Sequence, residues 1–465
     1  MSSPYFIRGF TPDFDRQSGT LKIAVSYVIQ PYSNPFTHFT SARTSWSYDI
    51  RGTNMAVNGS GEGSAAPTIR TAVEVQQTAG PQRFSFSFHA ENTYSGAAVD
   101  LALNLLIDVY SAGDVIIGGT AGDDLIVAGV GDDVLRGGSG SDYLAGDSGD
   151  DILVGGGDRA GDRLDGGAGA DRMYGGFGND RYRVNSRGDR VIERADADPN
   201  NKDIVEASVD HVLAANVEAL WLLGAAGLNG GGNALDNQLG GNDGANRLSG
   251  FGGRDELHGK GGADILLGGA GNDVLYGGED LDEDRLAGGS GDDHYYGLAG
   301  DRIVEAAGGG TDFVWTHEAF FALPDHVENL DASGRGTGSF RGLGNSGDNV
   351  IAGSFFADDR LAGRGGADTL SGSGGRDVLA GGGGTDTFGF ALESDVDKVT
   401  DFRAGADGER LALDLGSAFD TIEEVMAVAV FSGDRVVFDF GDGDRLILLG
   451  RFTESSFDPA NFVFG

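Results

Sequence analysis

The sequence predicts an all-β protein: an N-terminal antiparallel β-sandwich, then a parallel β-roll in three tracts, then a C-terminal β cap. Three observations predict this class. Of the 465 residues, 83 are glycine, which argues against long helices. Residues 1–113 contain stretches in which apolar and polar residues alternate, the period of a half-buried strand. From Gly118 a nine-residue unit recurs, with glycines at its start, an acidic residue in sixth place and an apolar residue in eighth.

Residues 1–113 are expected to form the sandwich. Alternating apolar residues predict strands at 21–29, 46–50, 69–75, 84–88 and 99–109. Clusters of Gly, Pro, Asn and Ser separate these stretches, as is typical of antiparallel sandwiches. Aromatic residues such as Trp46 and Phe86 could form a carbohydrate platform, although alternating aromatic residues more often belong to a hydrophobic core.

The nonapeptide recurs in three tracts, at residues 114–184, 232–299 and 344–389. Repeat-related linkers at 185–231 and 300–343 join them, and the cap follows at 390–465. The sixth-place aspartates are Asp124, Asp133, Asp142, Asp151, Asp162, Asp171 and Asp180, then Asp255, Asp264, Asp273, Asp284 and Asp293, then Asp359, Asp368, Asp377 and Asp386.

The linkers are related to each other. GDRVIERADADPNNKDIV, which begins at Gly188, reappears as GDRIVEAAGGGTDFV at Gly300, 112 residues later (300 − 188). Because chance composition does not preserve such a register, we infer that a long unit has been duplicated.

The nonapeptide predicts a tight turn followed by a short strand, because glycine in the first, second and fourth places permits positive φ. Two units, or 18 residues, would complete one coil, and the eighth-place leucines, such as Leu144 and Leu153, would stack into a thin core. Burying one leucine contributes about 1.5 to 3 kcal/mol. Ordering one unit's backbone costs on the order of 9 to 18 kcal/mol, so the core alone cannot stabilise the coil.

The sixth-place carboxylates indicate what else is needed. Unshielded carboxylates in stacked coils raise one another's pKa or push the coils apart, and a hard divalent cation reverses that repulsion. Calcium accepts six to eight oxygen ligands, including backbone carbonyls, whereas magnesium demands a strict octahedron. Aspartates and turn carbonyls therefore favour calcium.

The units GGSGSDYLA at 137–145 and GGAGNDVLY at 268–276 match GGxGxDxUx at every fixed place. The chain thereby resembles the RTX, or haemolysin-type, calcium-repeat proteins, with a serralysin-like C-terminal region. The resemblance implies calcium between a turn and the turn one coil on, so that Asp133 would pair with Asp151. It implies about eleven ions at most, and impaired sites at Asn246, at Arg302 in an expected aspartate position, and at Thr120 in a glycine position.

The resemblance also implies export. RTX proteins leave Gram-negative cells through a type I secretion channel, guided by an uncleaved C-terminal signal, and residues 390–465 look like such a segment, although they could equally be a plain cap. The chain has no cysteine, its start lacks the blocks of a cleavable signal peptide, and no apolar run is long enough to span a bilayer. These features alone would indicate a cytosolic protein, but they also fit the export that the resemblance implies. We therefore expect an extracellular protein. Its expected partners are calcium, the type I secretion machinery, and an extracellular glycan or cell surface. The net charge of −39 excludes nucleic acid as a partner.

Two function classes stay open. The first is a secreted calcium-binding protein that folds outside the cell and has a structural, adhesive or surface-associated role. The second is a secreted polysaccharide-acting hydrolase, lyase or epimerase whose repeats serve export and folding. Motifs place no active site, because HExxH and GxSxG are absent and no carboxylate pair can be assigned in residues 1–113. We interpret His211, His258, His294 and His326 as structural or surface residues, and a pore-forming toxin is disfavoured because no apolar helix is available.

Overall fold

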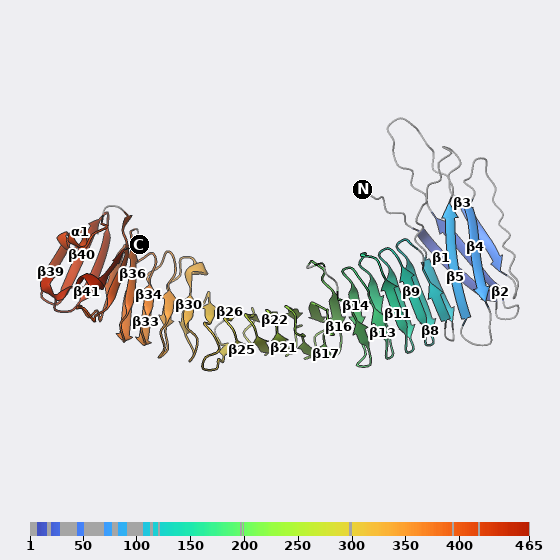
Figure 1. Ribbon diagram of the computed structural model, residues 1–465, viewed down its shortest axis with the longest axis horizontal. Coiled ribbons are helices and arrows are strands. Elements are labelled where there is room, and N and C mark those ends of the chain that lie inside the picture. Colours follow the sequence, from blue (N-terminus) through green and yellow to red (C-terminus); the bar gives the residue numbers. More distant parts are fainter. Residues whose placement is uncertain are drawn as a thin grey trace, which may run out of the picture. The chain divides into compact units, whose positions relative to one another are not determined.

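The structure, a computed structural model, describes residues 117–465 except 120, 196–197, 199, 297–299, 393–394, 417–418 and 465. Before residue 117 it describes only the backbone of strands β1 to β7. The chain divides into two units, residues 1–223 and 224–465, and each is described by itself (Figure 1).

The N-terminal strands are antiparallel. Strands β1 (Ile7–Asp15), β2 (Thr20–Tyr27) and β3 (Thr44–Ile50) form one sheet, and β4 (Ile69–Gln76) pairs with β5 (Gln82–Ala90). Four predicted strands are confirmed here, whereas β1 was not predicted. The side chains that would fill the predicted sandwich, and residues 99–105 of the fifth predicted strand, lie outside the described residues.

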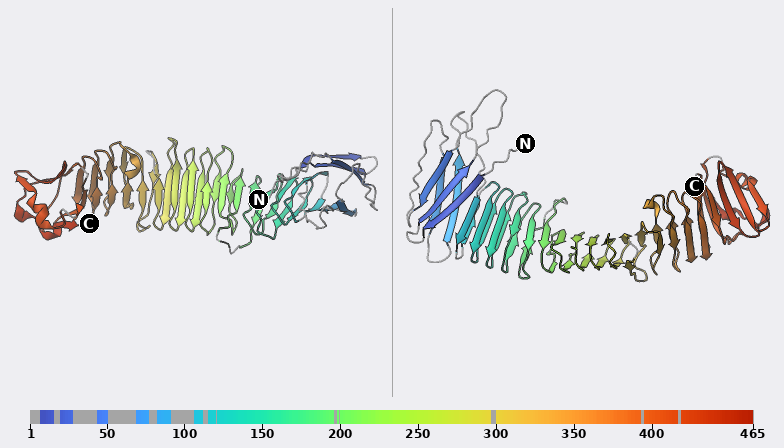
Figure 2. Two further views of the ribbon diagram at one scale, coloured as in Figure 1. Left: turned by 90° about the horizontal axis from the view of Figure 1, so that it is seen from above. Right: turned by 180° about the vertical axis from the view of Figure 1, so that it is seen from behind.

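Two parallel ladders build the roll of the first unit, as the stacked arrows of Figures 1 and 2 show. The first ladder contains β6 (Leu106–Ser111), β8 (Leu125–Val130), β10 (Tyr143–Ser148), β12 (Arg163–Asp165), β14 (Arg181–Val184), β16 (Ile204–Ala207) and β18 (Ala219–Leu222). The second ladder contains β7 (Val115–Gly118), β9 (Val134–Gly138), β11 (Ile152–Gly156), β13 (Arg172–Tyr174) and β15 (Arg190–Ile192), and β5 joins it beside β7. Strand β17 (His211–Val212) lies between β16 and β18 in the sequence.

The register of the ladders stacks the eighth-place residues. Leu144 pairs with Leu164 in one ladder, and Leu135 pairs with Leu153 in the other. All four side chains are fully buried. The predicted parallel roll with a thin core is therefore confirmed, and the all-β class with it.

The linker after tract 1 continues the coils of the roll. Strands β16 and β18 extend the first ladder from β14, and β15 extends the second from β13. The sequence pattern loses its glycines there, but the alternation of buried Val205 and Ala207 keeps a strand that fits the same register.

The second unit repeats this construction. Its longest ladder contains β20 (Gln238–Gly240), β22 (Glu256–Lys260), β24 (Val274–Gly278), β26 (His294–Tyr296), β28 (Phe313–Trp315), β30 (Asn329–Asp331), β32 (Val350–Ala352), β34 (Thr369–Ser371), β36 (Thr387–Ala391), β38 (Arg410–Asp414) and β42 (Phe462–Phe464). Opposite it run two shorter parallel ladders. One contains β19 (Asn229–Gly231), β21 (Arg247–Gly252), β23 (Ile265–Ala270), β25 (Arg285–Ser290) and β27 (Arg302–Ile303). The other contains β29 (Phe320–Ala322), β31 (Arg341–Leu343), β33 (Arg360–Gly365), β35 (Val378–Gly383) and β37 (Val396–Val399).

The C-terminal segment ends the roll with antiparallel strands. Strand β41 (Asp444–Leu449) pairs in parallel with β37, and β40 (Arg435–Gly441) and β39 (Ala429–Ser432) follow it as antiparallel neighbours. Helix α1 (Ile422–Ala427) precedes them and begins with a capping box. Phenylalanine side chains fill this segment, with ring centroids 6.0 Å apart for Phe438 and Phe457. This part of the chain thus has an aromatic core of its own.

Candidate metal centres

The sixth-place aspartates stack one coil apart. The main-chain N–H of Asp133 donates to Oδ1 of Asp151 at 2.7 Å, and the N–H of Asp142 donates to Oδ1 of Asp162 at 2.8 Å. The same bond recurs along both ladders, at separations of 18 or 20 residues. All sixteen predicted aspartates are at most 3% exposed. The structure therefore places these aspartates next to one another in successive coils. In each such pair, a main-chain N–H holds Oδ1 of the later aspartate.

The second carboxylate oxygen, Oδ2, is buried and accepts no hydrogen bond at twelve of these positions. They are Asp142, Asp151, Asp162, Asp171, Asp180, Asp255, Asp264, Asp273, Asp293, Asp368, Asp377 and Asp386. A buried carboxylate oxygen without a partner loses its hydration without compensation. Each of these atoms therefore lies where a cation would stabilise it.

The first-place glycine of each unit leaves room at that oxygen. A methyl carbon added to Gly146 would lie 2.1 Å from Oδ2 of Asp151 and 2.6 Å from the carbonyl oxygen of Gly166, one coil on. Two acceptor oxygens thus converge on space that only glycine keeps open. Hard oxygen donors from one carboxylate and one turn carbonyl are the ligands that calcium takes, so these residues fit the ion.

Burial makes these carboxylates costly to ionise. The pKa of Asp142 is raised to about 8 and that of Asp151 to about 7, mainly by burial and also by the neighbouring Asp162 and Asp171 carboxylates. Burial likewise raises the pKa of Asp264 to about 7. In the absence of a cation, the folded turn favours a proton on each group.

Two predicted sites differ from the expectation. Asp359 accepts hydrogen bonds at Oδ2 from the N–H of Ser354 at 2.5 Å and from its hydroxyl at 2.9 Å, so this oxygen is already satisfied. The prediction that Arg302 replaces a sixth-place aspartate was wrong. Arg302 pairs with Arg285 in the ladder, and Asp301 accepts the N–H of Asp284 at 3.3 Å. Thr120 lies outside the described residues.

Four aspartates that the sequence analysis missed continue the ladders beyond the tracts. Asp189, Asp203, Asp312 and Asp397 accept the N–H of Asp171, Asp180, Asp293 and Asp377 at 2.7 to 3.2 Å. The turns that lead to Asp189, Asp203 and Asp397 lack the glycine pattern, and that of Asp312 lacks only the first-place glycine. A usable signal was present in two of them, because an aspartate precedes a short apolar strand in DIV at 203–205 and DFV at 312–314.

In other turns, an asparagine in the sixth place makes the stabilising contacts that a cation would otherwise supply. Oδ1 of Asn246 accepts the N–H of Asn242 at 2.7 Å, and its amide nitrogen donates to the carbonyl of Leu228 at 3.1 Å. Asn349 makes the equivalent bonds with the N–H of Asn345 at 2.8 Å and the carbonyl of Val327 at 3.2 Å. An amide supplies donors where an aspartate supplies only acceptors. These turns, written GNDGAN and GNSGDN, therefore hold themselves together without an ion.

The histidines His258, His294 and His326 lie on strands or at a groove of the roll. The ring of His258 stacks on that of Tyr276 with centroids 4.4 Å apart, and Tyr276 stacks on Tyr296 at 4.2 Å. His294 is exposed. His326 lines an open groove of about 900 Å³ between β27 and the segment that follows β29, together with Arg302 and Arg364. These positions agree with the interpretation of the histidines as structural or surface residues.

Comparisons with known proteins place the repeats in a family. A family model described as the RTX calcium-binding nonapeptide repeat (4 copies) matches residues 118–153, 157–182, 231–266, 249–283, 281–304 and 355–388. The chain therefore carries RTX calcium-binding repeats, as the nonapeptide predicted.

The other comparisons add little. Among solved structures, the chain is similar to the extracellular lipase LipA from Serratia marcescens, with 17% sequence identity and a TM-score of 0.18 over 57% of this chain. The match spans 45% of the lipase, less than half its length. None of the curated proteins matches the chain. In the described part of the chain, no helix has the length and apolar character needed to cross a membrane.

Proposed function

We propose that this RTX repeat protein is secreted and that its β-roll folds when extracellular calcium fills the aspartate turns. The observation that carries the proposal is the row of twelve buried Oδ2 atoms without hydrogen-bond partners. Calcium would be held by these atoms and by first-place carbonyls, up to about eleven ions in all. The folded roll would then present the N-terminal module in a structural, adhesive or surface-associated role.

Export would depend on the same coupling between calcium binding and folding. Where calcium is scarce, as inside a cell, repelling carboxylates oppose folding, and an unfolded chain can pass through a type I secretion channel. Outside, sites with affinities of roughly 10⁻⁴ to 10⁻³ M would fill. Residues 390–465 would carry the export information as well as cap the last coil.

The role of the N-terminal module is tested on the full chain. A glycan array and a polysaccharide-degradation screen, each run with calcium and with chelator, separate the two classes. Glycan binding without turnover supports the adhesive role. Calcium-dependent cleavage or epimerisation of a polysaccharide would instead make the chain an enzyme whose repeats assist its folding.

Low pH is expected to promote folding of the metal-free chain, although less completely than calcium does. The folded pKa of Asp142 is about 8, well above its ordinary 3.8, so protonation favours folding. The stability that this group contributes is complete below about pH 4 and is lost as pH rises through about 8. Chain freed of metal by dialysis should therefore show more β structure by circular dichroism at pH 5 than at pH 8.

The matched control for the acid effect is the triple variant D142N, D151N and D162N, which should lose part of that pH dependence. An equal pH dependence in both proteins would assign the effect to net charge alone. In saturating calcium the sign reverses, because protons compete with the ion for the carboxylates.

An asparagine turn should acquire a calcium requirement when its amide is replaced. Asn349→Asp removes the donors to the carbonyls of Val327 and Glu328 and places a carboxylate in a site that is 1% exposed. We expect a loss of about 1 to 3 kcal/mol at low calcium, the cost of unsatisfied buried groups, and recovery at saturating calcium. Urea unfolding at both calcium levels measures this. Asn349→Ala, which lacks the carboxylate, should not recover, and recovery by both variants would contradict the interpretation.

A further inference from the structure

The end of tract 1 differs in its residues from the turns within the tract. Tyr182 occupies the eighth place, where most units carry leucine, and its side chain is fully buried. Its hydroxyl donates to Oε1 of Glu193, which follows β15 in the linker. Asp180 is the last sixth-place aspartate of the tract, and its N–H donates to Oδ1 of Asp203 at 2.7 Å. The linker thus contributes two carboxylates to the last turn.

Three carboxylates meet at this point. Asp180, Glu193 and Asp203 each place one oxygen within 4.8 Å of the others. Asp180 is 1% exposed, and its Oδ2 has no hydrogen-bond partner. That atom points to the open space beside Gly175, on which the Tyr182 hydroxyl and Oε1 of Glu193 also converge. An ordinary turn, such as that of Gly146, brings together one carboxylate and one carbonyl instead.

Asp180 and Glu193 have no basic side chain as a partner in the described part of the chain. Burial, followed by the charges of the Asp203 and Asp180 carboxylates, raises the pKa of Glu193 to about 9. Three negative groups in partly buried surroundings repel one another strongly unless a cation lies between them.

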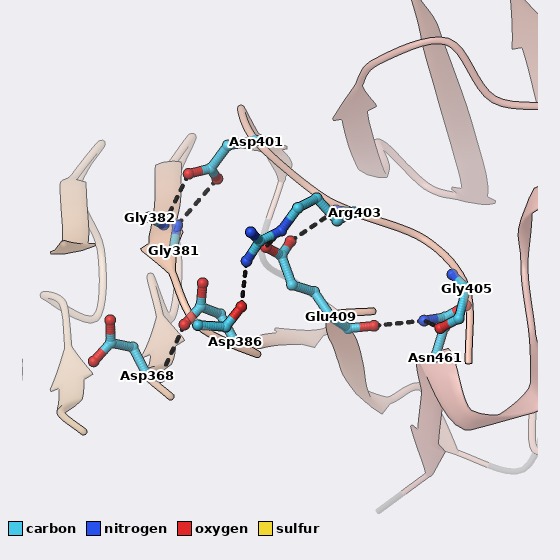
Figure 3. A network of polar contacts seen from close by, with 10 residues as sticks. Asp368, Gly381, Gly382, Asp386, Asp401, Arg403, Gly405, Glu409 and Asn461 are labelled. Atoms are coloured by element: carbon cyan, nitrogen blue, oxygen red, sulfur yellow. Dashed lines mark hydrogen bonds and ion pairs between the residues drawn. The ribbon is translucent and has the colours of Figure 1, made fainter. Parts of the chain in front are cut away.

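The end of tract 3 shows the alternative that this chain also uses. There Phe388 takes the eighth place, and Arg403 forms an ion pair at 2.9 Å with Glu409, whose side chain is fully buried. Figure 3 shows the Arg403 guanidinium between Glu409 and the turn of Asp386. A built-in cation thus pairs with the buried Glu409 beside the last turn of tract 3. Among the described residues, neither Asp180 nor Glu193 at the end of tract 1 has such an arginine.

The arrangement recurs after tract 2. Tyr295 is fully buried and donates to Glu305, and Asp293 and Asp312 each have a buried Oδ2 without a partner. Oε1 of Glu305 also accepts the N–H of Gly288 at 2.8 Å. The backbone therefore occupies the Glu305 oxygen more fully than it occupies Oε1 of Glu193, which makes Glu193 the better test.

We propose that Asp180, Glu193 and Asp203 form a three-carboxylate calcium site that closes tract 1 and ties the linker strand β15 to it. The Tyr182 hydroxyl orients Glu193 toward the ion. The site rests on the proposed function, since the ordinary turns bind the same ion, but it differs from them by an added negative ligand from outside the repeat. Because calcium affinity rises with the number of charged ligands, this site fills before the ordinary turns.

The test is a calcium-binding isotherm of the full chain, compared between wild type and Glu193→Gln. Wild type should show a small class of tight sites ahead of the main class, and E193Q should weaken one tight site by tenfold or more while the main class is unchanged. Glu206→Gln is the matched control, because Glu206 lies on β16 and forms an ion pair with Arg181 at 2.7 Å, and its carboxylate is not part of the cluster. It should bind as wild type does.

Terbium supplies a second readout that does not depend on the folding of E193Q. Tyrosine transfers excitation energy to a bound lanthanide nearby, so Tyr182→Phe should lower the terbium emission at the first equivalents added. Unchanged tight binding in E193Q together with unchanged early emission in Y182F would overturn this site. A wild-type chain that binds no calcium at all would overturn the proposed function instead, so the two failures are distinguishable.

Discussion

Removal of calcium at pH 8 is expected to abolish most of the strand signal of the roll, and its return is expected to restore that signal cooperatively. Each coil buries few apolar side chains, and ordering its backbone costs more than those side chains contribute. The twelve partnerless Oδ2 atoms add repulsion and desolvation, which a bound cation reverses. Folding and binding are therefore coupled, and the titration should be steep.

The measurement is far-ultraviolet circular dichroism of metal-free chain during a calcium titration, with magnesium as the control ion. Magnesium retains its waters and demands an octahedron, so it should restore little structure at the same concentration. A spectrum of the metal-free chain that already equals the calcium form would contradict the coupling. Equal recovery with magnesium would contradict the assignment to calcium.

The C-terminal segment should be the exception in that titration. Strands β39 to β41 pack on phenylalanine side chains such as Phe438, which is fully buried, and Arg403 neutralises Glu409. Neither contact needs an ion. Hydrogen exchange in metal-free buffer should therefore protect the backbone of β40 and β41 more than that of β10 and β11.

The repeats could be predicted from the sequence because their fixed places have fixed physical roles. Glycine in first place, aspartate in sixth and leucine in eighth specify the turn, the acid ladder and the core, so the pairing of Leu135 with Leu153 follows from counting. The same counting failed at Arg302, because a shorter turn moves Asp301 into the sixth place. Register in a solenoid is set by strand pairing, and the sequence shows it only where the unit length is constant.

The contribution of the linkers could not be predicted in the same way. Glu193 is 13 residues from Asp180 in the chain (193 − 180), at a spacing that the nonapeptide does not contain. Its proximity to Asp180 and Asp203 depends on how the linker re-enters the ladder at β15 and β16. Tyrosine in the eighth place at the ends of tracts 1 and 2 was the one local signal, because a buried hydroxyl requires a partner.

Gly146→Ala is expected to lower the stability of the roll strongly and to remove a bound ion. The added carbon would lie 2.1 Å from Oδ2 of Asp151 and 2.6 Å from the carbonyl oxygen of Gly166, which are the two oxygens that would hold the ion. The backbone of Gly146 does not have positive φ, so alanine itself is not strained there. Steric overlap costs about 1 to 3 kcal/mol. Loss of an ion present at a hundred times its dissociation constant removes about 2.7 kcal/mol more.

Gly157→Ala is the matched control, because a methyl carbon there meets no atom within 4 Å and the backbone again does not have positive φ. Its effect should stay within about 0.5 kcal/mol, as for an ordinary surface change. Thermal unfolding in saturating calcium and a count of bound ions measure both variants. Gly146→Ala should melt well below Gly157→Ala and bind at least one ion fewer. If the two variants bind equal numbers of ions, the cation does not lie beside the first-place glycine, and Oδ2 of Asp151 must be stabilised in another way.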